Sequence, residues 1–86
     1  MLYNIYSIKD ELANTFGNLM ILHPVTANRS FKWMTQEMEK ADCDDKRIYQ
    51  VGTFDNETGM IQAMTPVMVY NIEEVKKNNG ENFPTV

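Results

Sequence analysis

A run of polar side chains in the second half of the chain is the most patterned candidate for chemistry. Asp55, Asn56, Glu57 and Thr58 offer oxygen atoms, and Gly59 follows them. A calcium loop of the EF-hand kind needs about twelve residues with alternating oxygen ligands and a distal Glu, and that pattern is absent. Asp and Thr also accept hydrogen bonds from turn amides, and Gly supplies a positive φ. The run therefore predicts the corner of a β-hairpin rather than a metal site.

Thiol chemistry is a second candidate, because the chain has one cysteine and one histidine. Cys43 stands among Asp42, Asp44 and Asp45, whose negative charge raises the pKa of a thiol and leaves it a poor nucleophile. The sequence favours a plain loop thiol over a catalytic pair with His23, which is expected at a strand end. It also favours a solvated acidic loop over a cation site. With no phosphate loop, paired carboxylates or Ser/His/Asp arrangement, we expect no enzyme and no cofactor or metal.

Stacking and phosphate contact are a third kind of chemistry, and one predicted helix carries residues suited to both. Its polar side, at about 100° per residue, holds Arg29, Trp33, Gln36 and Lys40. Trp33 there can stack on an unpaired base while the cations hold phosphates. It can equally contact another protein, or pack under a loop or the C-terminal residues of its own chain. The residues expected to bind nucleic acid are Arg29, Lys32, Trp33, Lys40, Lys46 and Arg47.

Length and charge limit what these residues can do together. The chain has 86 residues, one cysteine, a net charge of −4 and a pI near 4.8. We expect a single domain without a disulfide, in a reducing cytoplasm, with no secretory signal and no membrane span. The acidic balance argues against indiscriminate binding to nucleic acid. Residues 26–47 are nevertheless neutral, with five basic and five acidic side chains, so a local patch can be positive.

The elements that must position these side chains follow from periodicity. Four segments rich in β-branched and aromatic residues are expected to be strands: residues 2–8, 19–23, 46–54 and 60–70. Gly17 marks a turn before the second strand, and Pro66 pushes the fourth toward an edge or a bulge. A helix capped by Thr26 or Asn28 is expected to run to about Lys40. Its apolar stripe consists of Ala27, Phe31, Met34, Met38 and Ala41.

These elements predict an α+β fold in which one amphipathic helix covers one face of a four-stranded, mostly antiparallel sheet. The chain order is β-β-α-β-β. Residues 1–70 form the expected domain, residues 42–45 a loop, and residues 71–86 a polar, flexible tail.

The sheet has more apolar surface than one helix can cover. The first predicted strand is apolar on both sides. In the third, Ile48 and Phe54 are expected on one side, and Tyr49 and Val51 on the other. The fourth strand sets two groups against each other: Met60, Met64 and Met68 against Ile61, Ala63, Val67 and Val69. The methionines are expected to fill the core rather than to form a binding face.

Because large apolar patches are uncommon on soluble monomers, this surplus predicts a homodimer with C2 symmetry. The alternative is that the tail folds back over the open face through Ile72, Val75 and Phe83.

Four short motifs in order also carry a resemblance. They are Ile8-Lys9-Asp10 at the end of the first strand, Arg29 and Phe31 in the helix, the residues Tyr49, Val51, Gly52, Phe54, Asp55, Thr58 and Gly59, and then Pro66-Val67. Over residues 3 to about 69 the chain resembles the small nonstructural protein family of gokushovirus-type microviruses, which are single-stranded DNA bacteriophages. The resemblance implies a nonstructural accessory role without catalytic residues. Some members are labelled DNA-binding.

Two hypotheses follow. The first is a phage accessory protein that binds single-stranded DNA during viral genome replication or packaging. The second is a homodimeric adaptor that binds a viral or host protein and contacts no nucleic acid. The expected partners are a second copy, single-stranded DNA and viral or host replication proteins, in the cytoplasm of the bacterial host rather than in the mature virion.

Overall fold

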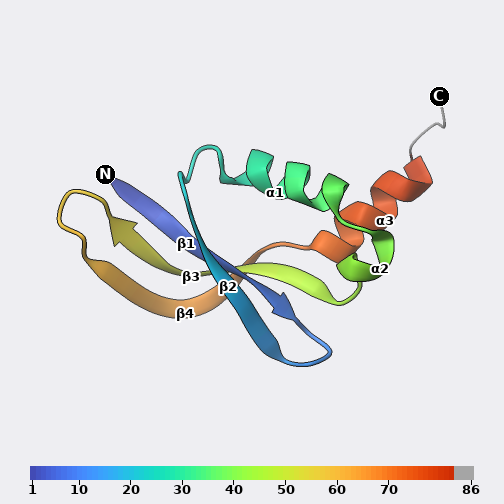
Figure 1. Cartoon of the computed structure of the whole chain (residues 1–86), viewed down its shortest axis with the longest axis horizontal. Coiled ribbons are helices and arrows are strands. Elements are labelled where there is room, and N and C mark those ends of the chain that lie inside the picture. The colour runs from blue at the N-terminus through green and yellow to red at the C-terminus, as the bar shows by residue number, and fades with distance from the viewer. Residues whose placement is uncertain (83–86) are drawn as a thin grey trace.

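The computed structural model describes residues 1–82, and its strands form one antiparallel sheet (Figure 1). The strands are β1 Leu2–Asp10, β2 Thr15–Leu22, β3 Lys46–Asp55 and β4 Ile61–Tyr70. They lie in the order β2-β1-β3-β4, and each neighbouring pair is antiparallel. The α+β fold expected from the sequence is confirmed. Pro66 lies in edge strand β4, where a proline is tolerated.

Within residues 1–82, three helices accompany the sheet, where the sequence predicted one: α1 Ala27–Glu37, α2 Lys40–Cys43 and α3 Ile72–Asn82. All three contribute to a core on the same side of the sheet (Figure 1). The tail expected from residue 71 onward is wrong for residues 72–82. Ile72 is fully buried and begins α3, because its side chain enters the core beside α1 and α2. Phe83 lies outside the described residues.

The core is centred on Phe31. Its ring meets Tyr6 of β1 edge-on at 4.9 Å and Tyr70 of β4 at 5.5 Å between ring centroids. Ile48 and Ile72 are also fully buried in this cluster. Removal of such a side chain from water contributes roughly 1.5–3 kcal/mol to folding. The face of the sheet toward the helices therefore supplies the main hydrophobic stabilisation of the single chain.

The long predicted helix is broken near its end. α1 stops at Glu37, Met38 and Glu39 take extended backbone angles, and α2 starts at Lys40. The Lys76 ammonium group donates to the Thr35 and Gln36 carbonyls at 3.3 Å. A cation therefore satisfies carbonyl groups in the last turn of α1.

The break also changes which residues the helical segment buries. Ala41 is exposed instead of continuing the predicted stripe, and Cys43 is buried. The expected loop thiol is therefore a core residue of α2.

The β1–β2 connection differs from its prediction. Gly17 lies inside β2 rather than in a turn, and its carbonyl accepts a hydrogen bond from Ser7 Oγ at 3.0 Å. The turn occupies residues 11–14 and closes with Asn14 at a φ of 56°. Asp10 Oδ1 accepts two backbone hydrogen bonds from this turn, which lower the pKa of the Asp10 carboxyl. The turn is therefore stabilised by the Asp10 side chain rather than by Gly17, the residue expected to form it.

The polar run at residues 55–59 is the predicted hairpin corner. The Gly59 amide donates to the Asp55 carbonyl at 2.7 Å, and Gly59 has a φ of 76°. Asp55 Oδ1 accepts from the Glu57 amide at 2.9 Å. This backbone hydrogen bond is the main cause that lowers the pKa of Asp55. The oxygen atoms that could have been metal ligands hold the turn.

A register shift changes which face of the sheet the side chains at the end of β3 point to. The pairing of β1 with β3 shifts between Ile5 and Tyr6. Phe54 pairs with Tyr3 on the far side of the sheet, whereas Ile48 faces the helices. The prediction that Phe54 and Ile48 share a side is wrong, because strict alternation assumes a strand without bulges.

No helix or loop among residues 1–82 covers the face of the sheet away from the helices, and we call it the open face. Residues in opposite register point to the same side of a sheet. Register and ring contacts assign to it Tyr3, Ile5, Phe16, Leu19, Ile21, Tyr49, Phe54, Ile61, Ala63 and Met68.

Two expectations about the sheet surface fail. Met60, Met64 and Met68 do not fill the core, because all three are exposed at or in edge strand β4. The alternative in which the tail folds over the open face is also wrong for residues 72–82. In the described part of the chain, Ile72 anchors α3 on the opposite side of the sheet.

Candidate nucleic-acid interface

The outer side of α1 presents a tryptophan beside two cations. Ala27, Phe31 and Thr35 are buried toward the sheet, so the positions between them face outward. Arg29 and Lys32 are exposed, and Trp33 has 66% of its surface exposed. Among the described residues, Trp33 therefore packs under neither a loop nor the C-terminal segment. The other two possibilities, protein contact and base stacking, both require the exposure that Trp33 has.

Trp33 borders a shallow hollow between α1 and edge strand β2. The residues that line it are Met20, Leu22, Arg29, Ser30, Trp33 and Met34. Apart from Arg29 and Ser30, these side chains are apolar. A flat, apolar group such as a nucleobase finds here a ring to stack on and aliphatic side chains beside it, with a guanidinium group at the border. Met20 and Leu22 carry no local signal for this hollow, because they reach it only through the pairing of β2 with β1.

The outer side of α1 carries two exposed cations, Arg29 and Lys32, and one exposed acid, Glu37, so its net charge is positive. Arg29 and Lys32 belong to none of the ion pairs formed among residues 1–82. The first turn of α1 contains no acidic residue, and its N-cap, Thr26, makes no side-chain capping bond. The amide end of the helix dipole therefore adds positive potential close to Arg29.

Lys40 is separated from these residues by the break after α1. The prediction placed Arg29, Trp33 and Lys40 along one helical face, but Lys40 begins α2 after two extended residues. It lines a different hollow, which lies between α2 and α3 and includes Cys43, Asp44, Asn71, Glu73, Glu74, Lys76 and Lys77. The charges around Lys40 are mixed, so it does not extend the positive side of α1.

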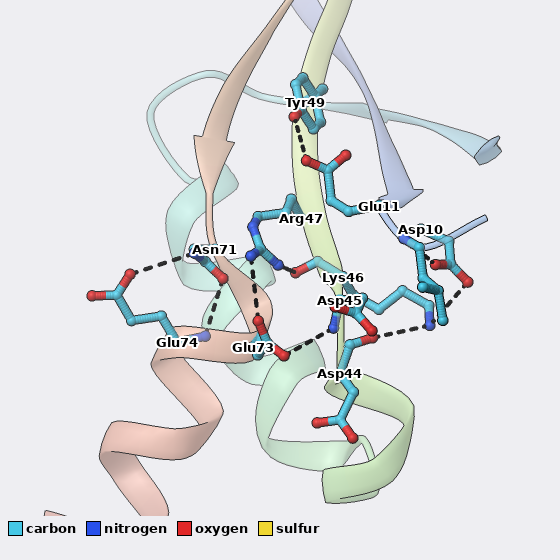
Figure 2. Close-up of polar contacts among 11 residues, drawn as sticks. Asp10, Glu11, Asp44, Asp45, Lys46, Arg47, Tyr49, Asn71, Glu73 and Glu74 are labelled. Carbon is cyan, nitrogen blue, oxygen red and sulfur yellow. Dashed lines mark hydrogen bonds and ion pairs between the residues drawn. The ribbon is translucent and has the colours of Figure 1, made fainter. Parts of the chain in front are cut away.

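Lys46 and Arg47 lie at the start of β3 and are paired with acids (Figure 2). Lys46 Nζ is 3.6 Å from an Asp10 carboxylate oxygen, and an Arg47 guanidinium nitrogen is 3.3 Å from Glu73. Glu73 also accepts from the Asp45 amide at 3.1 Å. The ion pairs of these two cations connect β3 to β1 and to α3. Their charge is therefore offset by acids of the same chain.

The remaining candidates have structural roles. Burial raises the pKa of the Cys43 thiol, with a smaller contribution from Asp42 and Asp44. His23 follows the end of β2, where its Nδ1 accepts from the Val25 amide at 3.1 Å. Across the described residues, no group of three or more His, Cys, Asp or Glu side chains is placed to hold a metal ion.

One cluster was not foreseen at all. On the open face, the Phe16 and Tyr49 rings meet edge-on at 5.5 Å, and Lys9 Nζ lies 5.4 Å and 5.5 Å from their centroids. Glu11 bonds Lys9 Nζ at 3.1 Å and the Tyr49 hydroxyl at 3.1 Å. The hydrogen bond from Lys9 is the main cause that lowers the pKa of Glu11. The cluster joins three strands and leaves no local signal in the sequence.

The fold and this surface define a small α+β protein with an exposed aromatic and cationic helix. Residues 3–75 match the Phage ORF5 protein family, and the chain belongs to that family. The phage origin implied by the sequence resemblance is thereby confirmed. No curated protein and no solved structure is significantly similar to the chain. None of the helices in the described part of the chain is long and apolar enough to cross a membrane.

Proposed function

We propose that this phage accessory protein binds single-stranded DNA through Arg29, Lys32 and Trp33 of α1. The observation that carries the proposal is a tryptophan with 66% of its surface exposed beside two cations that form no ion pair among the described residues. We assign the protein to the nonstructural proteins of gokushovirus-type microviruses, with a role in genome replication or packaging. That role supplies single-stranded DNA as the ligand.

Each part of the site has its own task. Trp33 stacks on one unpaired base, because an indole ring offers a large flat surface that accepts any base. Arg29 and Lys32 contact the phosphates on either side of that base, and the amide end of α1 adds to their field. Lys40, Lys46 and Arg47 contribute little, because Lys40 lies beyond the helix break and the other two are paired with Asp10 and Glu73.

The acidic net charge sets the strength and the salt dependence of this binding. At −4, the chain as a whole repels DNA, so only the local positive side of α1 attracts it. Two phosphate contacts on a single strand give a log–log salt slope of about −1.4. Binding is therefore expected to be weak at physiological salt and to strengthen at low salt.

Titration with single-stranded oligonucleotides at low salt tests the proposal directly. Trp33 is the one tryptophan of the chain, so quenching of its emission reports contact at the proposed site. Trp33→Ala, followed by anisotropy of a labelled oligonucleotide, is expected to weaken binding by about 5- to 150-fold, the equivalent of one stacked base. Unchanged tryptophan emission at micromolar protein would exclude the site.

Charge variants separate site contacts from net charge. Arg29→Gln and Lys32→Gln are each expected to weaken binding and to reduce the salt slope by about 0.7. Lys77→Gln removes the same charge from an exposed position on α3 and serves as the matched control. Equal losses for all three variants would indicate a general charge effect rather than a site.

The second candidate function is an adaptor that binds a viral or host protein and contacts no nucleic acid. It is favoured by the acidic net charge and by the exposed apolar side chains of the open face. A pull-down of partners that survives nuclease treatment, together with a negative oligonucleotide titration, would support the adaptor over the DNA-binding protein.

A further inference from the structure

We propose that the open face is a homodimer interface, through which two copies of the chain pack sheet against sheet with C2 symmetry. The inference is independent of DNA binding, because it uses the face of the sheet opposite to α1. In such a pair the helices form the two outer layers, and the sheets lie about 10 Å apart.

The first argument is how the apolar side chains are placed. Three rows run across the sheet in register: Tyr3, Phe54 and Ile61; then Ile21, Ile5, Gly52 and Ala63; then Leu19, Ser7, Tyr49 and Met68. Leu19 and Ile61 are each 65% exposed and Met68 is 48% exposed. Leu19, Ile61 and Met68 stand on the two edge strands. On the central strands, Tyr3, Tyr49 and Phe54 are partly exposed, whereas Ile5, Ser7 and Gly52 are buried. Exposed apolar side chains therefore extend over all four strands, and those of two copies can interdigitate.

The second argument is area. Phe16, Leu19, Ile21, Ile61 and Met68 are each roughly half exposed, and a large side chain contributes about 200 Å² when fully accessible. These five residues alone therefore present on the order of 500 Å² of apolar surface. With the partly exposed rings of Tyr3, Tyr49 and Phe54, the face comes close to the 800 Å² or so per partner of a standard interface.

The third argument is charge, which favours a second copy of this chain over a strongly charged protein as the partner that covers the open face. The chain carries a net charge of −4, so two copies repel each other at most orientations. At the open face, however, Lys9 and Glu11 neutralise each other at 3.1 Å. Two such faces meet without like-charge repulsion, whereas a strongly basic or acidic partner finds no complementary charge there. A chain of this length also has a marginal core, which association strengthens.

Sedimentation equilibrium of the full chain tests the proposal, with a single-chain mass of 10.0 kDa as the reference. Wild type is expected at twice that mass at micromolar concentration. Leu19→Glu places a charge on the β2 edge of the apolar interface and is expected to weaken association at least about a hundredfold. Val25→Glu is the matched control: Val25 is apolar and 82% exposed but lies in the turn before α1, so this variant stays dimeric.

The far-UV spectrum shows whether each variant is folded, and Ile61→Glu on the opposite edge strand replaces Leu19→Glu if the latter unfolds. A wild-type mass of one chain at about 100 μM would overturn the proposal and leave the open face to a different protein. A dimer that persists in both Leu19→Glu and Ile61→Glu would overturn the assignment of the face. The dissociated variants are expected to bind oligonucleotide as wild type does, so failure of one proposal does not imply failure of the other.

Discussion

On one face of the sheet, Tyr6 and Ile48 are buried beneath the helices; on the other, Leu19, Ile21 and Ile61 face solvent. The same strands supply both faces. The difference shows that the single chain buries most of its large side chains on the covered face, although Ile5 is also buried among its neighbours on the open face. On the open face the strands are held by backbone pairing and by the Lys9–Glu11 cluster. Its apolar side chains remain available to a partner.

The largest expected effect is a loss of stability in Ile48→Ala, which is compared with Ile61→Ala on the open face. Ile48→Ala is expected to cost about 2–5 kcal/mol, because Ile48 is fully buried and its loss leaves a cavity. Ile61→Ala is expected to change the stability of the dissociated chain by less than about 0.5 kcal/mol, since Ile61 is 65% exposed. Urea unfolding at low protein concentration, where association does not contribute, measures both variants.

Similar losses in the two variants would contradict the contrast between the faces. The same measurement at high protein concentration adds the contribution of association to the comparison. There Ile61→Ala is expected to lose stability relative to wild type, because the wild-type dimer gains from association.

A smaller effect is expected from the backbone packing of the open face. A Cβ at Gly52 would lie 2.5 Å from the Gln62 carbonyl oxygen of β4, so Gly52→Ala forces these two strands apart. The expected cost is about 1–3 kcal/mol, as for other overpacked sites. Thermal unfolding of Gly52→Ala measures this cost.

Gly59→Ala in the β3–β4 turn is the comparison. No atom lies within 4 Å of its added Cβ, and only the φ of 76° opposes the change, at roughly 1–2 kcal/mol. A Gly52→Ala protein as stable as wild type would mean that β4 moves freely relative to β3.

The smallest expected effect is a pH dependence at the open face. The pKa of Glu11 is below its ordinary value in the folded chain, chiefly through the hydrogen bond from Lys9. Its carboxylate therefore stabilises the fold above the unfolded pKa near 4.5, and this contribution is lost as pH falls through the lower folded pKa. Glu11→Gln is expected to reduce the loss of stability between pH 5 and pH 3, measured as the shift in urea midpoint. A wild-type slope in Glu11→Gln would show that Asp10 and Asp55, whose pKa values are also lowered, account for the acid sensitivity.

Local patterns predicted the elements well where neighbours in sequence decide the structure. The hairpin at Asp55 and Gly59 and the burial of Ala27 and Phe31 follow from turn chemistry and helical spacing. The helix was predicted three residues too long because Lys76, distant in sequence, caps the end of α1. Polar composition likewise concealed α3, whose place depends on one buried isoleucine.

The candidate site was predicted only in part. Arg29, Lys32 and Trp33 lie together because spacing along one helix is a local property. Lys46 and Arg47 looked equally suitable, yet their pairing with Asp10 and Glu73 depends on strand register and on the position of α3. Likewise, the Met20 and Leu22 side of the hollow depends on the pairing of β2 with β1.

The sequence by itself determined that this protein has more apolar strand surface than its helices can cover, because alternation counts the apolar groups on each strand without reference to its neighbours. It also determined that a cationic and aromatic side of α1 faces away from the core. Only the tertiary structure decided which groups stay exposed. Strand bulges place Phe54 and Met68 on the open face, and ion pairs across β1, β3 and α3 use the charge of Lys46 and Arg47. Both outcomes depend on contacts between residues far apart in the chain. Local periodicity contains no information about such contacts.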